Sequence, residues 1–169
     1  MTKHELTTPV FDASHFRTVL GHFCTGVTIV TAVDGDTPVG FACQSFQSLS
    51  LEPPLVSVAA TRTSSSLPRI QAAGRFVANV LTEDQEHVSR AFAVSGADKF
   101  AGLGWSLSPA GSPVLDDVLA WVDCEIVDEL DGGDHAIVIG RVLDLALVRD
   151  AKPLLFFRGQ YVRLSADAG

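Results

Sequence analysis

Apolar and polar residues alternate along most of this chain, and only a few stretches follow the wider spacing of an amphipathic helix. The first such stretch places apolar side chains at i, i+3, i+4 and i+7, namely Phe16, Val19, Leu20 and Phe23. We expect a helix there, capped by Asp12 and ending near residue 23. Two more helices are predicted, one over 64–73 and one that begins at Thr82, where Gln85 completes a capping box.

The remaining apolar runs have the length and the β-branched content of strands. In chain order they cover 26–33, 38–45, 55–60, 76–81, 120–130, 135–148 and 154–164. Residues 34–35 and 131–134 are predicted hairpin turns, whereas 96–113, rich in glycine and proline, is an expected long loop. About seven strands with few helices predict a mainly β fold, an antiparallel barrel with Greek-key connections rather than a βαβ sheet.

Composition and charge narrow the class of protein. The 169 residues fit one domain, and the net charge of −8, with scattered Lys and Arg, argues against nucleic-acid binding. No apolar run approaches the roughly 20 residues of a membrane-spanning helix, and residues 1–10 lack the apolar core of a signal peptide. Cys24, Cys43 and Cys124 lack metal-binding or disulfide-framework spacing, so we expect reduced core thiols in a cytoplasmic protein that contacts no membrane.

Common catalytic and metal-binding patterns are missing from the sequence. The stretch 102–104 lacks the third glycine of a dinucleotide fingerprint and does not lead from a strand into a helix. There is no Walker A, GxSxG or HExxH pattern, and the histidines share no metal-ligand spacing with the cysteines. We therefore predict no catalytic side chain and no metal site.

The segment Pro38–Ser50 is unusual for a strand and its exit. Gly40 allows a backbone or a flat ring to approach closely. Polar groups then stand beside two aromatic ones: Gln44, Ser45, Ser48 and Ser50 beside Phe41 and Phe46. An isoalloxazine ring needs such apolar walls with donors and acceptors at its edge. The alternative is an ordinary strand and turn with one polar face.

Residues 61–66, Thr-Arg-Thr-Ser-Ser-Ser, follow one predicted strand and precede a predicted helix. Free N–H groups at a helix start, with hydroxyls and Arg62 nearby, suit a phosphate group. Plain helix capping is the alternative and needs only one of these residues. Chemistry alone therefore allows a flat ring and a phosphate to bind, but it does not identify the ligand.

Several longer motifs carry a resemblance to one known family. They are 16–31 (FRTVLGHFCTGVTIVT), Gly40 to Val56, Gly74 to Leu81, Asp98 to Phe100, Gly133 to Gly140 and Pro153 to Tyr161. Over roughly 14–164, nearly the whole chain, the sequence resembles the flavin-reductase-like, FMN-binding split-barrel family. Within it, the chain is most similar to the small reductase components of two-component flavin-dependent monooxygenases.

This resemblance implies a single domain over 1–169, a six-stranded Greek-key split β-barrel with a few flanking helices. It also implies a homodimer with the flavin near the subunit interface. The expected cofactors are FAD or FMN, with NADH, or alternatively NADPH, as the hydride donor. The residues implied to lie near them are Val39, Gly40, Phe41, Ala42, Gln44, Ser45, Ser57, Val58, Ala59, Thr63, Ser64, Ser65, Phe92, His135 and Tyr161.

Each group of these residues has an implied role. Residues 39–42, with Gln44 and Ser45, would contact the isoalloxazine and the ribityl chain, and 57–59 would line the other edge of the ring. Residues 63–65 would hold the phosphate, and Phe92 would pack on the flavin or its adenine. His135 and Tyr161 would lie near the nicotinamide; their structural alternatives are a polar residue beside a turn and an aromatic residue that packs the barrel.

The implied function is an NAD(P)H-dependent flavin reductase that supplies reduced flavin to a separate monooxygenase. Many relatives have Thr or Ser within the stretch Phe41-Ala42-Cys43, and their absence here leaves the choice between FMN and FAD open. The main alternative is a non-catalytic flavin- or haem-binding split-barrel protein. Another is an enzyme like pyridoxamine-phosphate oxidase, for which this chain has few basic residues.

Overall fold

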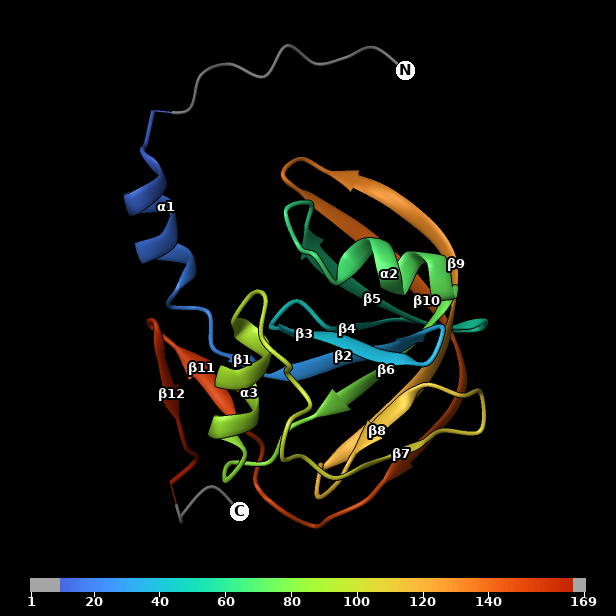
Figure 1. The fold of residues 1–169 in the computed structure, drawn as a ribbon. Helices are drawn as coiled ribbons and strands as arrows, with labels where there is room; N and C mark the ends of the chain where they lie inside the picture. The colour runs from blue at the N-terminus through green and yellow to red at the C-terminus, as the bar shows by residue number, and fades with distance from the viewer. Residues whose placement is uncertain (1–9, 166–169) are drawn as a thin grey trace.

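The computed structural model describes residues 10–165, and its largest element is an antiparallel sheet curled into a barrel (Figure 1). Seven strands follow the order β3-β2-β6-β9-β10-β5-β4. They are β2 Thr28–Asp34, β3 Thr37–Cys43, β4 Gln47–Leu51, β5 Pro54–Thr61, β6 Arg75–Val80, β9 Ala120–Gly132 and β10 His135–Leu147. The edge strands β3 and β4 are joined by residues 44–46 alone, which brings the two sheet edges together. The predicted mainly β barrel is confirmed, with seven strands in this sheet where six were implied.

Two small sheets complete the strands, and they correct the sequence-based expectation. One contains β1 Thr25–Gly26, β11 Leu155–Phe157 and β12 Gln160–Val162; the other is the hairpin of β7 Trp105–Leu107 and β8 Pro113–Leu115. The single strand predicted over 154–164 is wrong, because the chain turns at Arg158 and Gly159, which have φ of 53° and 78°. The long loop predicted over 96–113 likewise contains β7.

The first helix, α1 Ala13–Leu20, begins as the sequence predicts. The Asp12 carboxylate accepts a hydrogen bond from the His15 backbone N–H at 2.7 Å, so it caps the helix. The helix ends before residue 23 because Gly21 closes it, with its N–H bonded to the Arg17 carbonyl.

The other two helices begin three and four residues later than predicted. Helix α2 is Leu67–Ala73, with Pro68 in its first turn, where the missing N–H costs no hydrogen bond. Helix α3 is Glu86–Ala93. Half of the predicted capping box exists, because the Gln85 side-chain oxygen accepts from the Thr82 N–H at 3.1 Å. Residues 82–85 nevertheless form a turn that leads into the helix.

The core has two parts that meet along β2, which explains why this strand is β-branched on both faces. Val30 and Ala32 point into the barrel interior, where they join a cluster that includes Phe76, Val138 and, from α2, Ile70. Val27 and Ile29 belong to a second cluster between the barrel and α3, with Leu81, Val88, Phe92 and Phe100. Burial on both faces fixes β2 against both the barrel interior and α3.

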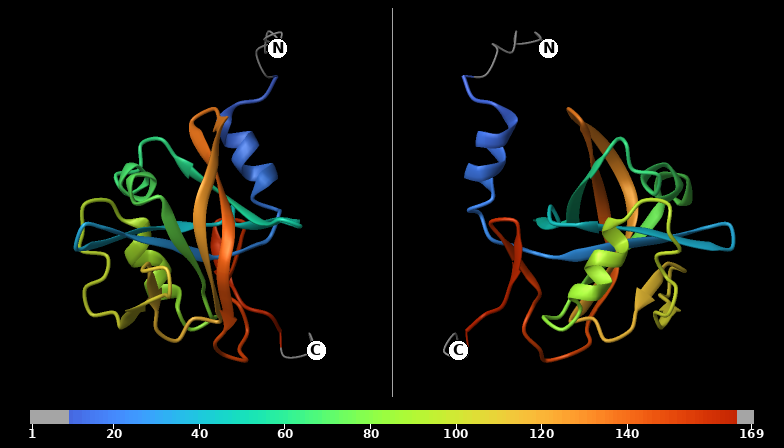
Figure 2. Two further views of the ribbon diagram at one scale, coloured as in Figure 1. Left: turned by 90° about the vertical axis from the view of Figure 1, so that its right-hand side faces the viewer. Right: turned by 60° about the vertical axis from the view of Figure 1, so that its left-hand side comes forward.

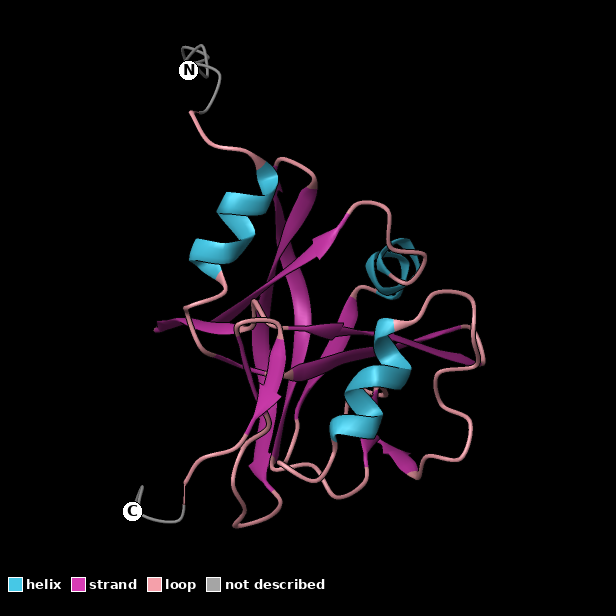
Figure 3. Ribbon diagram, turned by 90° about the vertical axis from the view of Figure 1, so that its left-hand side faces the viewer, coloured by secondary structure: helices cyan, strands magenta, loops and turns pink. Residues whose placement is uncertain are grey.

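Helix α1 stands apart from the strands, whereas α2 and α3 pack against the barrel (Figures 2 and 3). None of the α1 side chains is buried in the single chain. Within residues 10–165, no helix has the length and apolar character needed to cross a membrane. The three cysteines are free thiols, as predicted, although Cys24 is exposed and only Cys43 and Cys124 belong to the core.

A buried amide connects three strands beside the second core cluster. Asn79 of β6 has no exposed surface. Its Nδ2 donates to the Ile29 carbonyl at 3.1 Å and to Thr31 Oγ1 at 3.0 Å, both on β2. Its Oδ1 accepts from the Leu115 N–H of β8 at 2.9 Å. The amide therefore holds the β7–β8 hairpin against the barrel.

Replacing Asn79 by Ala should lower the free energy of unfolding by about 1–3 kcal/mol, because buried backbone groups of Ile29 and Leu115 lose their partner. Urea denaturation followed by circular dichroism measures the change. The control is Ser106→Ala, which also removes a polar group from this region but at an exposed position of β7. Equal stability of the two variants would contradict the structural role of Asn79.

Candidate functional site

A cleft of about 590 Å³ opens at one rim of the barrel. Its walls come from the end of β3 and the residues after it, the end of β5, helix α3, and the β11–β12 hairpin. It contains ten of the residues that the sequence predicted for a site: Phe41, Ala42, Gln44, Ser45, Ala59, Thr63, Ser64, Phe92, His135 and Tyr161. The structure thus brings together segments that lie more than a hundred residues apart in the chain.

The other predicted site residues lie outside this cleft. Val39, Gly40 and Ser65 line a neighbouring hollow instead. Ser57 and Val58 line a third hollow, on the side of residues 23–26, and both are almost fully buried. Val39 and Val58 belong to the barrel core, so they support the cleft from behind.

Gly40 determines how closely α3 approaches the barrel. A Cβ at this position would lie 2.7 Å from the Val30 carbonyl oxygen and 2.8 Å from Cε1 of Phe92, closer than side chains tolerate. The absence of a side chain therefore lets the Phe92 ring rest on β3. This contact places α3 as one wall of the cleft and gives the cleft an apolar aromatic surface.

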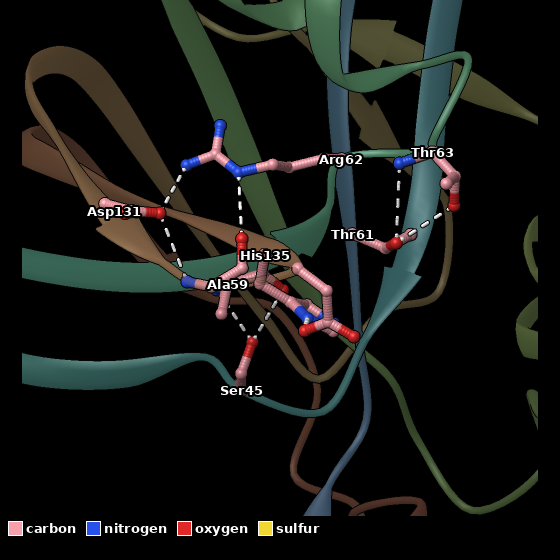
Figure 4. A network of polar contacts seen from close by, with 9 residues as sticks. Ser45, Ala59, Thr61, Arg62, Thr63, Asp131 and His135 are labelled. Atoms are coloured by element: carbon pink, nitrogen blue, oxygen red, sulfur yellow. Dashed lines mark hydrogen bonds and ion pairs between the residues drawn. The ribbon is translucent and has the colours of Figure 1, made fainter. Parts of the chain in front are cut away.

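Ser45, which lines the cleft, joins the exit of β3 to β5 (Figure 4). Its Oγ accepts from the Ala59 N–H at 2.8 Å and donates to the Ala59 carbonyl at 3.0 Å. The side chain thus bonds both backbone groups of one β5 residue. This pair of hydrogen bonds fixes where the two edges of the sheet meet, and the cleft opens beside it.

The hydroxyl-rich segment 61–66 forms the turn between β5 and α2. The N-cap residue of α2, Ser66, makes no side-chain capping bond; instead Ser64 Oγ accepts from the Ser66 and Leu67 N–H groups, each at 3.3 Å, so Ser64 serves the helix start in the way the simpler alternative required. Thr61 and Thr63 bond each other through their hydroxyls at 3.0 Å. Thr61, Thr63 and Ser64 all line the cleft, so capping and ligand contact are compatible there.

Arg62, which the sequence placed near a phosphate, turns away from the cleft (Figure 4). Its Nη2 pairs with Asp131 at 2.9 Å and its Nε donates to the Gly133 carbonyl at 3.1 Å, both in the β9–β10 turn. The bond from Arg62 and then that from the Gly133 N–H lower the pKa of the Asp131 carboxyl. The arginine secures this turn rather than the ligand.

Sequence reasoning missed Lys99, the only Lys or Arg among the described residues that line the cleft. Its Nζ donates to the Gly40 carbonyl at 3.0 Å, and burial lowers its pKa from the usual value. The motif Asp98-Lys-Phe100 was a signal, but the sequence did not place it beside β3. Cys43 and Thr61 lie within the two segments that the sequence offered as ligand-binding, and the remaining cleft residues without a sequence prediction are Val27, Ala60, Ser89, Ala93, Ser95 and Phe156.

His135 and Tyr161 stand at the margins of the cleft, and each is held by a neighbour. His135 Nδ1 lies 2.7 Å from the carboxylate of Asp134 (Figure 4). The hydrogen bond from His135, and then its charge, lower the pKa of the Asp134 carboxyl. The Tyr161 hydroxyl bonds Ser89 Oγ of α3 at 2.8 Å, and the Arg90 guanidinium lies over its ring at 4.9 Å. The contacts of Tyr161 with Ser89 and Arg90 hold the β11–β12 hairpin against α3.

The chemistry of these side chains fits a flavin. Phe41, Ala42 and Ala59 provide apolar surface, Gln44 provides polar groups at its edge, and hydroxyls with Lys99 suit a phosphate. In the part of the chain described here, no cluster of three or more His, Cys, Asp or Glu side chains is arranged to hold a metal ion. The residues that line the cleft are therefore compatible with a flat ring that carries an anionic tail.

Comparisons with known proteins point to the same chemistry. A family model described as a flavin reductase like domain matches residues 20–165. The chain is 52% identical over 156 residues to the reductase subunit HsaB of a flavin-dependent monooxygenase from Rhodococcus jostii, covering 92% of this chain and 80% of that protein.

Two solved structures are similar over most of their length. Nitrilotriacetate monooxygenase component B from Mycobacterium thermoresistibile is 51% identical, with a TM-score of 0.90 over 92% of this chain and 88% of that one. The NADH:FAD oxidoreductase SgcE6 from Streptomyces globisporus, solved with NAD and FAD fragments, is 35% identical, with a TM-score of 0.89 over 98% and 100%.

Proposed function

This chain belongs to the flavin reductase like family, and from that membership we propose that it uses NADH to reduce FAD or FMN and supplies the reduced flavin to a separate flavin-dependent monooxygenase. The observation that carries the proposal is the cleft at the barrel rim, which combines apolar walls, hydroxyl groups and one lysine. A bound flavin accepts a hydride from a reduced nicotinamide at its ring. No protein acid, base or nucleophile is needed for that transfer.

The residues of the cleft divide into a ring-binding end and a phosphate-binding end. Phe41, Ala42 and Ala59 contact the isoalloxazine, and Gln44 and Ser45 meet its polar edge. Thr63, Ser64 and Lys99 hold the phosphate, where a cation and hydroxyls replace the water that a free phosphate binds. Val39, Gly40, Ser57 and Val58 position these groups from behind, and Ser65 extends the hydroxyl surface beyond the cleft.

The protein contributes orientation and control of water rather than bond-making groups. Phe92, resting on Gly40, supplies an aromatic surface beside the ring. His135 has one ring nitrogen held by Asp134, so its Nε2 is oriented for the carboxamide of a nicotinamide. Tyr161, fixed by Ser89, limits the space on the other side. NADH is favoured over NADPH because, among the described residues, Lys99 is the one Lys or Arg that lines the cleft, and the 2′-phosphate of NADPH calls for a cluster of such groups.

We expect the purified chain to consume NADH only when flavin is added, since hydride transfer needs the cofactor and not a protein residue. Loss of nicotinamide absorbance, measured for NADH and NADPH with FAD and with FMN, tests this. Omission of flavin is the control. Flavin binding without NADH or NADPH consumption would instead support the non-catalytic flavin-binding alternative. Oxygenation of an organic substrate by this chain alone would contradict the role as a reductase component.

Replacing His135 by Ala should raise the KM for NADH about fivefold, the cost of one net hydrogen bond of about 1 kcal/mol, with a smaller change in the KM for flavin. Steady-state kinetics with each substrate varied in turn measures both constants. His87→Ala is the control, because His87 is exposed on α3 and lines a different hollow. A larger change for flavin than for NADH would place His135 elsewhere in the site.

We also propose that the enzyme is a homodimer. The described residues leave the apolar face of α1 largely uncovered: Phe16, Val19 and Leu20 are each about half exposed, and Phe23, just after the helix, is 76% exposed. Further exposed apolar side chains lie on β4, β9 and β10, namely Leu51, Val127, Leu143, Leu145 and Leu147. Soluble domains usually cover an apolar helix face of this kind, which supports burial of these residues against a second copy.

Sedimentation equilibrium should give twice the chain mass of 17.9 kDa. The double variant Phe16→Glu with Leu20→Glu should shift the protein toward the monomer, because it places two charges on the apolar face of α1. The control is Ser14→Glu with Thr18→Glu, which adds the same charges at the same spacing on the other side of the helix. Monomeric wild-type protein, or equal behaviour of the two variants, would contradict dimerisation through α1.

We further infer a cytosolic location for this reductase. The three cysteines are free, and a reducing compartment keeps exposed thiols such as Cys24 in that state. NADH is also available there for the proposed reaction.

A further inference from the structure

The side chain of Ser45 continues the sheet where backbone pairing between β4 and β5 stops. The two strands pair as far as Gln47 opposite Ser57, and the same antiparallel register places Ser45 opposite Ala59. There the Ser45 hydroxyl makes the bonds to both backbone groups of Ala59. Both residues line the proposed flavin cleft and also the hollow beside residues 23–26, so this pair forms part of the wall between the two.

The thiol of Cys43 contacts the same hydroxyl, with Sγ 3.2 Å from Ser45 Oγ. Cys43 ends β3 and is only 4% exposed, and it lines the cleft while it also belongs to the barrel core. Its main chain is held separately, because Thr28 Oγ1 of β2 donates to the Cys43 carbonyl at 3.2 Å. The end of β3 is thus fixed to β2 by its backbone and to Ser45 by its thiol.

The number of hydrogens on the Ser45 hydroxyl determines the direction of its contact with the thiol. A serine hydroxyl has one hydrogen to donate and two lone pairs that accept. The hydrogen goes to the Ala59 carbonyl at 3.0 Å, and one lone pair accepts from the Ala59 N–H at 2.8 Å. The second lone pair is what remains for Cys43, so the thiol is the donor. The hydroxyl is then saturated and has no hydrogen bond left for a ligand.

We propose that Cys43 is a positioning residue for the flavin and that it acts by donating its thiol hydrogen to Ser45. This inference rests on the proposed function, in which Phe41, Ala42 and Ala59 contact the isoalloxazine. A thiol that donates keeps the Ser45 hydroxyl turned toward Ala59, so the exit of β3 stays bonded to β5 beside the ring. Ser45 then serves the polar edge of the flavin by where it holds the chain rather than by a hydroxyl bond.

Titration of flavin fluorescence with the full-length protein, without NADH, measures the Kd of FMN and of FAD. Cys43→Ala should raise both about three- to tenfold, the effect of one lost hydrogen bond, and by similar factors because the two flavins share the ring. Cys43→Ser keeps a donor at this position and should stay within about twofold of wild type. Cys124→Ala, which removes the other buried thiol of the barrel core, is the matched control and should change neither Kd.

A double-mutant cycle separates action through Ser45 from direct contact with the flavin. Ser45→Ala removes the acceptor of the thiol, so it should weaken flavin binding at least as much as Cys43→Ala does. The variant with both changes should bind no more weakly than Ser45→Ala alone, because the thiol then has no partner. Additive losses would show that Cys43 acts on the flavin independently of Ser45 and would overturn the inference.

Infrared spectroscopy of the flavin-free protein tests the hydrogen bond itself. The S–H stretching band moves to lower frequency when a thiol donates a hydrogen bond, and the loss of one band in Cys43→Ala identifies the band of Cys43. We expect Ser45→Ala to move that band to higher frequency. Ser48→Ala, at an exposed position of β4, is the control and should leave the band in place.

Three results would each overturn the inference: an unmoved S–H band in Ser45→Ala, unchanged flavin affinity in Cys43→Ala, or equal losses of affinity in Cys43→Ala and Cys43→Ser. Failure of the wild-type protein to bind either flavin would instead reject the proposed function, and this role of Cys43 with it, whatever the infrared band shows.

Discussion

The contact between Gly40 and Phe92 is the constraint on which the site depends. Because β3 has no side chain at this position, the Phe92 ring lies directly on the strand and α3 closes one side of the barrel rim. The Gly40 carbonyl then accepts bonds from Ser66 and Lys99, which come from two further segments. One residue without a side chain thus sets the distances between β3, α2, α3 and the loop that carries Lys99.

Around that contact, polar bonds between distant segments shape the cleft more than any single element does. Ser45 bonds both backbone groups of Ala59, and Tyr161 bonds Ser89, so the two sheet edges and the C-terminal hairpin keep fixed positions. A cofactor that carries the reaction needs little more than such a rigid, partly apolar frame. Hydride transfer to a flavin therefore places no demand for an acid, a base or a nucleophile on the residues that line the cleft.

The outer surface has a separate part in the proposed function. Helix α1 keeps the amphipathic pattern of a packed helix, yet no side chain of α1 is buried by its own chain. Such a helix is stable in water only when its apolar face is covered. In the proposed dimer, the second copy provides that cover. The apolar residues of α1 that remain exposed when one chain folds are then buried when two chains associate.

The sequence by itself determined the elements whose signals are local: the Asp12 cap of α1, the strands of the barrel, their hairpin turns, the family, and ten of the residues that line the cleft. It did not determine the break at Arg158–Gly159, because the residue type of Arg158 does not signal its positive φ and a single glycine within an apolar run is equally typical of a strand bulge. Tertiary structure decided that Arg62 leaves the site to pair with Asp131, that Lys99 enters it, and that a second hollow lies behind Lys99. The Arg62 and Lys99 contacts join residues 69 and 59 positions apart, and hydrophobic periodicity describes only neighbours along the chain.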